Sequence, residues 1–126
     1  MSMPLQFITA PRGFEPLVDF ALHDVEGVTG LYALRATESE TRVFVVDAGV
    51  HLPDYTPEIS NEQGSALQLE SSDNAIVLVV ANPGNGGMTL NLMAPIVVNA
   101  TTGRCAQVIL EGQEWPLRAE LAPRLG

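Results

Sequence analysis

An apolar run interrupted by a proline, MTLNLMAPIVVN at residues 88–99, constrains the fold more than any other feature of the sequence. From Met88 to Val98 every second residue is apolar, whereas the residues between them are mixed. This period of two is typical of a β-strand with one buried face. Proline lacks the N–H that a strand ladder needs, so Pro95 indicates a sheet edge or a bulge that bends the strand. We therefore expect one long strand over 88–98, bent at Pro95, whose two halves could pair with different neighbours.

Other parts of the chain are also β-like. The glycine- and asparagine-rich stretch NPGNGG (82–87) indicates a hairpin loop between two strands. No helical period persists for three turns, and we expect at most one short helical turn, over 53–60. Alternating or β-branched apolar segments predict strands over residues 17–23, 31–36, 42–48, 66–71, 74–81, 106–110 and 115–121. The sequence thus predicts a single all-β domain over 1–126, an antiparallel barrel or sandwich with little helix.

The chain is acidic. Its formal net charge is −9, and all 6 basic residues are arginines. Direct nucleic-acid binding is not expected, because phosphate contacts need a basic patch and none is visible. Residues 1–63 hold ten of the 15 acidic residues, so a basic partner would meet this half more readily. The charge could equally serve solubility alone.

The sequence predicts a cytoplasmic protein without membrane association. No apolar run approaches the roughly 18 residues that a membrane-spanning helix needs. The N-terminal stretch MSMPLQFITAPRGF has no basic region before its apolar residues, unlike a signal peptide. The single cysteine, Cys105, allows no internal disulfide, which agrees with a reducing compartment.

Candidate catalytic and metal-binding residues are few. Cys105 with His23 or His51 is the one Cys/His combination, and it has no local sequence signature. Asp47, His51 and Asp54 lie close together in the sequence but match no metal-ligand spacing. With no lysine, Schiff-base chemistry is excluded. We therefore expect no catalytic site, no metal and no cofactor, which favours a binding or regulatory protein over an enzyme.

The run MTLNLMAPIVVNATTGRCAQVIL (88–110) resembles the signature of the flagellar assembly factor FliW family. That signature is a T-x-N-L-x-A-P-I-V-x-N strand, a turn, and a Q-V-x-L strand. Two weaker blocks, RGFEPLVDFAL (12–22) and FVVDAGVHLPDYTPEIS (44–60), also resemble the family and stand in the same order. The signature is matched by Thr89, Asn91, Leu92, Ala94, Pro95, Ile96, Val97, Asn99, Gln107, Val108 and Leu110.

The resemblance implies a compact, antiparallel β-barrel-like fold without enzyme activity. It also implies two partners, the RNA-binding translational repressor CsrA and flagellin, bound one at a time. Export of flagellin would free the protein to bind CsrA and relieve the repression of flagellin translation. The chain departs from the family at Ala48 and Ala10 and in a short C-terminal tail, which affects loop geometry and part of a partner surface.

Candidate partner-binding residues come from two segments. The outward positions of the signature strand offer Asn91, Met93 and Val97, and Asn99 follows at its end as a turn former. The middle loop offers Asp54 and Tyr55, where an aromatic residue beside an acid suits an interface rim. The alternative is that Tyr55 packs on the barrel and Asn91 satisfies backbone groups that the bend at Pro95 leaves unpaired. A small-ligand-binding β-barrel remains the alternative function.

Overall fold

The computed structural model describes residues 2–11, 14–25, 27, 29–52, 55, 57, 59–69, 74–84, 87–110 and 119–120. Strands dominate it, as the sequence predicts. Its elements follow one another as β1 (Ser2–Phe7), β2 (Asp19–Asp24), β3 (Leu31–Ala36), β4 (Arg42–Asp47), α1 (Ala48–His51), α2 (Asn61–Ala66), β5 (Ala75–Gly84), β6 (Gly87–Leu90), β7 (Ile96–Asn99), β8 (Arg104–Gln107) and β9 (Ala119–Glu120).

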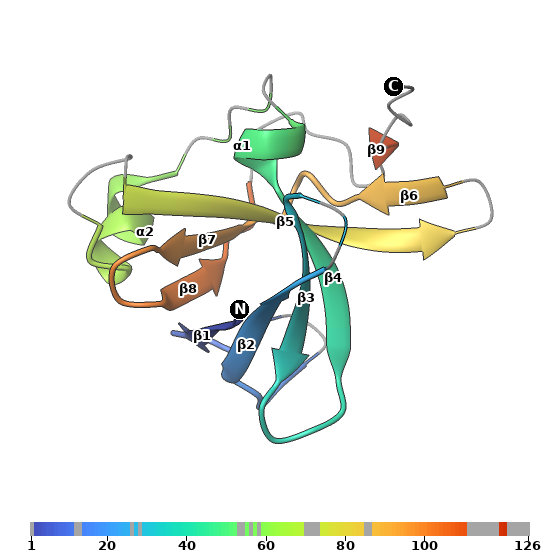
Figure 1. Ribbon diagram of the computed structural model, residues 1–126. Coiled ribbons are helices and arrows are strands. Elements are labelled where there is room, and N and C mark those ends of the chain that lie inside the picture. Colours follow the sequence, from blue (N-terminus) through green and yellow to red (C-terminus); the bar gives the residue numbers. More distant parts are fainter. Residues whose placement is uncertain are drawn as a thin grey trace.

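Seven of these strands close into a barrel (Figure 1). The hydrogen-bonded order is β4-β3-β2-β1-β8-β7-β5, and β5 also pairs with β4, which completes the ring. Every pair in the ring is antiparallel except β1 and β8, which run parallel from Gln6 beside Arg104 to Phe7 beside Cys105. The predicted all-β barrel is therefore confirmed, with one parallel seam. Strands β6 and β9 extend the sheet beyond the ring.

The opening segment, 88–99, is not one strand. It forms β6 and β7, separated by a turn over residues 91–95, so the prediction of a continuous strand is wrong. Both halves pair with the same neighbour, because β5 is long enough to hold β7 along Ala75–Leu78 and β6 along Ala81–Gly84. Pro95 stands at the end of the turn, where its missing N–H costs no ladder bond. The predicted interruption at Pro95 is thus correct, and it is a break instead of a bend.

The barrel interior is filled by its own side chains. Alternate residues of the ring strands point inward, as the period of two requires. Phe20 lies at the centre, with edge-to-face contacts to Phe7 and Phe14 at centroid distances of 5.2 and 6.2 Å. The buried residues of this interior are Leu5, Phe7, Phe20, Leu22, Leu34, Ala36, Val45, Leu78, Ile96, Val98 and Cys105.

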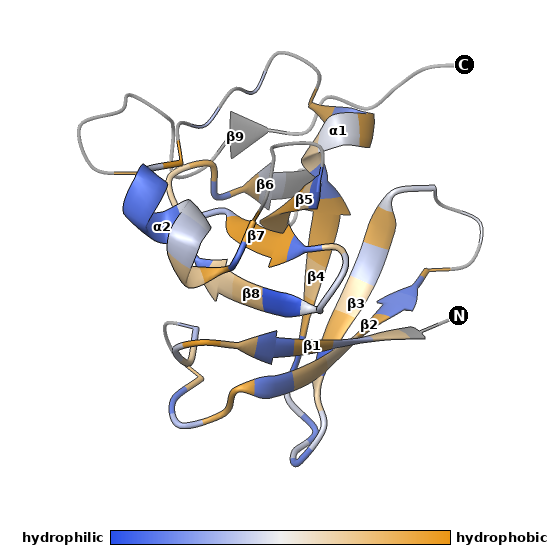
Figure 2. Ribbon diagram, turned by 90° about the vertical axis from the view of Figure 1, so that its left-hand side faces the viewer, coloured by the Kyte–Doolittle hydropathy of each residue, from blue (hydrophilic) through white to orange (hydrophobic). Residues whose placement is uncertain are grey.

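Two smaller cores cover the outside of the barrel. One lies over β4, β5 and β6 and is covered from the α1 side by Leu52 and Tyr55. The other lies over β7 and the segment after β8, and it includes Leu67 at the end of α2. In Figure 2 the first part of the α2 ribbon is hydrophilic and β7 is mostly hydrophobic. The apolar cover comes from Leu67 and Leu69, which follow the helix. Strand β7 is consequently buried on both faces, whereas the sequence pattern predicted one.

Helix α2 replaces part of a predicted strand over 66–71. Ser60 and Gln63 form a capping box, in which the Ser60 hydroxyl accepts from Gln63 N at 3.1 Å and the Gln63 side chain accepts from Ser60 N at 2.9 Å. The helix ends in a Schellman motif, where Leu69 N donates to Gly64 O and Gln68, with φ of 57°, donates to Ser65 O. The strand prediction is therefore wrong over its described residues. Leu67 is buried, but at the end of a helix and not in a strand.

Gly64 gives a test of this helix. It lies inside α2, and a Cβ at this position would meet no atom within 4 Å. Because glycine loses more backbone entropy on folding than alanine, we expect Gly64→Ala to raise the free energy of unfolding by about 0.5–1 kcal/mol. Urea unfolding followed by circular dichroism would measure the change. A lower stability would contradict the assignment of 61–66 as helix.

Most of the remaining predictions are confirmed. Strands form within or next to the segments predicted at 17–23, 31–36, 42–48, 74–81 and 106–110, and 82–87 is part of the β5–β6 hairpin. The sequence pattern missed β1. It also placed its single helical turn over 53–60, whose described residues contain no helix, whereas α1 and α2 form on either side. Of the strand predicted over 115–121, the structure describes only β9, and the other positions lie outside the described residues. Neither described helix has the length and apolar character to span a membrane.

Candidate partner-binding surface

Asn91 and Met93 lie in the turn that separates β6 from β7. The Asn91 side-chain oxygen accepts a hydrogen bond from Met93 N at 3.1 Å, which closes an Asx turn. The backbone of the same turn is held by Asn91 N, which donates to Val80 O, and by Leu110 N, which donates to Met93 O. Both side chains are half-buried. Asn91 therefore has an internal role. Its side chain satisfies a backbone group that the broken strand would leave unpaired.

Tyr55 fixes this turn from the outside. Its hydroxyl donates to Leu92 O, and its ring packs against both outer cores. Burial raises the pKa of Tyr55 to about 12, so the hydroxyl stays protonated and remains a donor. The structure thus places Tyr55 on the barrel, bringing it together with the Asn91 turn. Asp54, its predicted companion, lies outside the described residues.

Val97 and Asn99 lie on the outer side of the barrel, but both are buried, so neither is exposed to a partner. Val97 is 0% exposed and packs in the core next to α2, and Asn99 is 1% exposed. The Asn99 amide nitrogen donates to Leu67 O at 2.8 Å and to Gln68 O at 3.2 Å. Its side-chain oxygen accepts from Thr101 N at 2.9 Å, as expected of a turn former. Asn99 therefore joins the end of β7 to the end of α2, and its side chain is closed to a partner.

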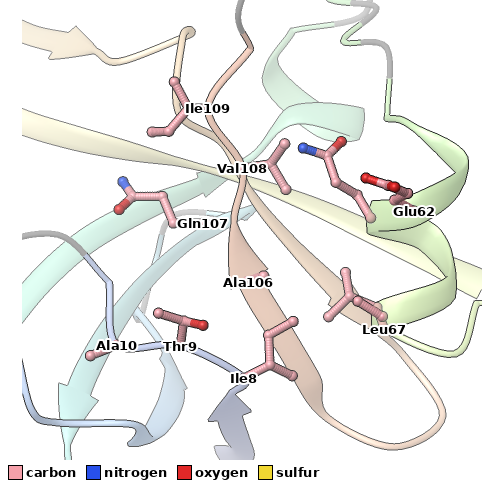
Figure 3. Close-up of a pocket in the computed structure, with 11 residues that line it drawn as sticks. Ile8, Thr9, Ala10, Glu62, Leu67, Ala106, Gln107, Val108 and Ile109 are labelled. Carbon is pink, nitrogen blue, oxygen red and sulfur yellow. The ribbon is translucent and has the colours of Figure 1, made fainter.

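An apolar groove lies elsewhere, between the chain after β1, helix α2 and the end of β8 with the segment that follows it (Figure 3). Its volume is about 460 Å³. It holds Ile8 and Ile109, which are 43% and 37% exposed and are two of the three large hydrophobic side chains exposed among the described residues. Glu62 stands at the edge that α2 provides. Exposed apolar side chains gathered in one hollow, with charge at the rim, are typical of a protein-binding surface.

Sequence reasoning missed this groove because its walls come from three distant segments. One signal was present: in the predicted strand over 106–110, Val108 and Leu110 alternate with Ile109, so Ile109 had to point away from their core. Ala10, one of the two single residues at which the chain departs from the family pattern, lines the groove. The other, Ala48, is buried at the start of α1.

The candidate catalytic residues are engaged in structural contacts. Cys105 is fully buried in the barrel, and burial raises the pKa of its thiol to about 12, which disfavours the nucleophilic thiolate. His51 Nε2 lies 2.8 Å from Thr29 O, and Asp47 accepts from Gly49 N at 2.9 Å as the N-cap of α1. Within the described part of the chain, no three His, Cys, Asp or Glu side chains gather closely enough to hold a metal ion.

Known proteins resemble this chain in sequence and in fold. The family model described as FliW protein matches residues 4–121. The flagellar assembly factor FliW of Thermoanaerobacter pseudethanolicus is 31% identical over 117 residues, covering 90% of this chain and 78% of that protein. The one of Treponema pallidum is 29% identical, covering 94% and 85%. A crystal structure of the flagellar assembly factor FliW superposes with a TM-score of 0.88 at 22% identity, covering 96% of this chain and 86% of that one.

Proposed function

The chain belongs to the FliW family, and from this premise we propose that it is a partner-switching regulator that binds CsrA and flagellin one at a time. Binding to CsrA would relieve the repression of flagellin translation, and flagellin would remove the protein from CsrA by mass action. The observation that carries the proposal is the family match over residues 4–121, which is almost the whole chain. The buried Cys105 thiol supports a role in binding instead of catalysis.

The charge of the chain supports a basic partner. The net charge is −9, with no lysine. CsrA proteins grip RNA, which requires basic surface, so an acidic protein is electrostatically complementary to them. Complementary charge mainly raises the association rate and is screened by salt. This part of the proposal therefore predicts binding that weakens as salt rises.

We place the CsrA contact at the groove of Figure 3. Ile8 and Ile109 offer apolar anchors that water contacts in the free protein, and Glu62 at the rim suits a basic partner. Apolar side chains at the centre of an interface contribute most of its binding energy, while rim charges orient the partner. Val97 and Asn99 drop out of the contact surface because they are buried.

Calorimetric titration of the full chain with CsrA from the same genome, at two salt concentrations, tests the function. We expect binding that is tighter at low salt, and release of CsrA when flagellin is added. Binding that ignores salt would keep the regulatory role and assign the charge to solubility. If neither CsrA nor flagellin binds, the proposed function is wrong.

A pair of substitutions tests the surface. We expect Ile109→Ala to weaken CsrA binding about tenfold, because it removes an apolar anchor without changing charge. Val50→Ala is the matched control, since Val50 is the third exposed large hydrophobic residue in the part of the chain that the structure describes. It is 43% exposed and lies on α1, not in the groove. An equal loss in both variants, or none in Ile109→Ala, would place the contact elsewhere.

A further inference from the structure

The inward-facing rows of three neighbouring strands end in polar residues at one mouth of the barrel. In β2 the row runs through Leu22 to Asp24, in β3 it begins at Tyr32, and in β4 it runs through Val45 to Asp47. Period-two geometry keeps all three polar side chains on the interior side. Asp24 is the direct cross-strand neighbour of Tyr32, and Asp47 is that of Leu78. This mouth lies where β4 leads into α1 (Figure 1).

A cavity of about 400 Å³ opens at this mouth. Its floor is apolar and is formed by Met3, Leu22, Ile76 and Leu78, which also belong to or pack against the barrel interior. Its polar lining consists of the three residues that end the rows, and no described residue of the lining is basic. The cavity is therefore apolar at its base and acidic at its rim.

The carboxylates of Asp47 and Asp24 both affect the Tyr32 hydroxyl. The pKa of Tyr32 is raised, first by burial and then by the negative charges of Asp47 and Asp24. The Tyr32 hydroxyl therefore remains protonated and keeps both its donor and its acceptor capacity. One oxygen of the Asp47 carboxylate accepts a hydrogen bond of 2.9 Å from Gly49 N, which holds the side chain where β4 leads into α1. The mouth thus places one exposed and one half-buried carboxylate beside an apolar floor.

We infer that this mouth binds an organic cation, an ammonium or guanidinium group on a short aliphatic stem. The stem lies on the floor that Leu22 and Leu78 provide, and the charged end lies between Asp24 and Asp47, with Tyr32 as a further hydrogen-bond partner. Such a ligand can be a free aliphatic amine or the side chain of a lysine or arginine on another protein. The inference rests only on the residues that line this mouth. It holds whether or not CsrA binds at the groove.

Amide NMR titration of the full chain with n-butylammonium chloride, at constant ionic strength, tests the site. We expect saturable shifts in the ends of β2, β3 and β4 that line the mouth. Two matched probes separate the contributions: 1-butanol has the same stem without charge, and butyrate has the opposite charge. We expect 1-butanol to bind at least about fivefold more weakly and butyrate not to bind. Equal binding of 1-butanol, or shifts that do not saturate, would overturn the inference.

Two variants that each remove one negative charge test where the cation binds. Asp47→Asn keeps the N-cap of α1, because asparagine caps as well as aspartate, yet it removes one charge from the mouth. We expect it to weaken n-butylammonium binding about fivefold. Asp19→Asn removes the same charge from the exposed far end of β2 and is the control, which should leave binding unchanged. An equal effect of both variants would mean general attraction to an acidic protein and would contradict the site.

A capped lysine distinguishes the two sources of the ligand. Nα-acetyl-lysine methylamide carries the same butylammonium group on a peptide-like backbone. If it binds as tightly as n-butylammonium, a lysine side chain of a partner fits the mouth. If it binds far more weakly, the site admits free amines only. Either result supports the cation site, provided that the Asp47→Asn variant weakens it.

Discussion

Replacing Asn99 by aspartate is expected to lower the free energy of unfolding by about 3–5 kcal/mol, because a buried carboxylate oxygen would face two carbonyl oxygens. Asn99 is 1% exposed, and its amide nitrogen donates to the carbonyl oxygens of Leu67 and Gln68. A carboxylate has no hydrogen to give and would place negative charge against both oxygens. The bond accepted from Thr101 N could persist, so the loss isolates the link between β7 and α2. Urea unfolding at neutral pH measures the effect.

Asn91→Asp is the matched control for this change. Asn91 is half-buried, and its side-chain oxygen accepts a hydrogen bond from Met93 N. A carboxylate accepts that bond equally well, and aspartate is common in Asx turns. We therefore expect a change below about 0.5 kcal/mol. If the two aspartate variants lose the same stability, the burial of Asn99 and its link to α2 do not have the role assigned to them.

Gly103→Ala is expected to lower the free energy of unfolding by about 2–4 kcal/mol. Gly103 has φ of +79°, a left-handed conformation that alanine adopts only with strain. Its Cβ would also lie 2.6 Å from Pro4 O, so the backbone of β1 must move. That movement strains the hydrogen bond of 2.9 Å from Gln6 N to Gly103 O, beside the parallel seam that closes the barrel. Thermal unfolding gives the stability, and hydrogen exchange at Gln6 and Ile8 reports on the seam.

Gly27→Ala separates the cost of left-handed backbone strain from the cost of a steric clash. Gly27 has φ of +85°, but a Cβ there would meet nothing within 4 Å. Only the left-handed strain applies, and we expect a loss of about 1–2 kcal/mol with no change in exchange at the seam. A loss as large as that of Gly103→Ala would show that the contact with Pro4 contributes nothing.

The candidate site was only partly accessible to sequence reasoning. The resemblance to the FliW family rested on residues 88–110 and is confirmed by the family match over 4–121. The individual partner-binding residues were harder to predict. A strand pattern gives the direction in which a side chain points, but not which element covers it. Val97 and Asn99 do point away from the barrel interior, yet α2 and the residues after it bury them. Ile8 and Ile109 were not chosen, because the groove that joins them exists only in the folded chain.

The sequence by itself determined the class of the fold, the positions of most strands, the hairpin over 82–87 and the interruption at Pro95. These are local properties: the period of two, turn residues and a missing N–H act within a few residues of themselves. The tertiary structure alone decided that β6 and β7 share β5, that β1 and β8 close the ring in parallel, and that β7 is buried on both faces. The physical reason is that pairing partners and covering elements come from distant segments, whose contacts are selected by the burial of the whole chain.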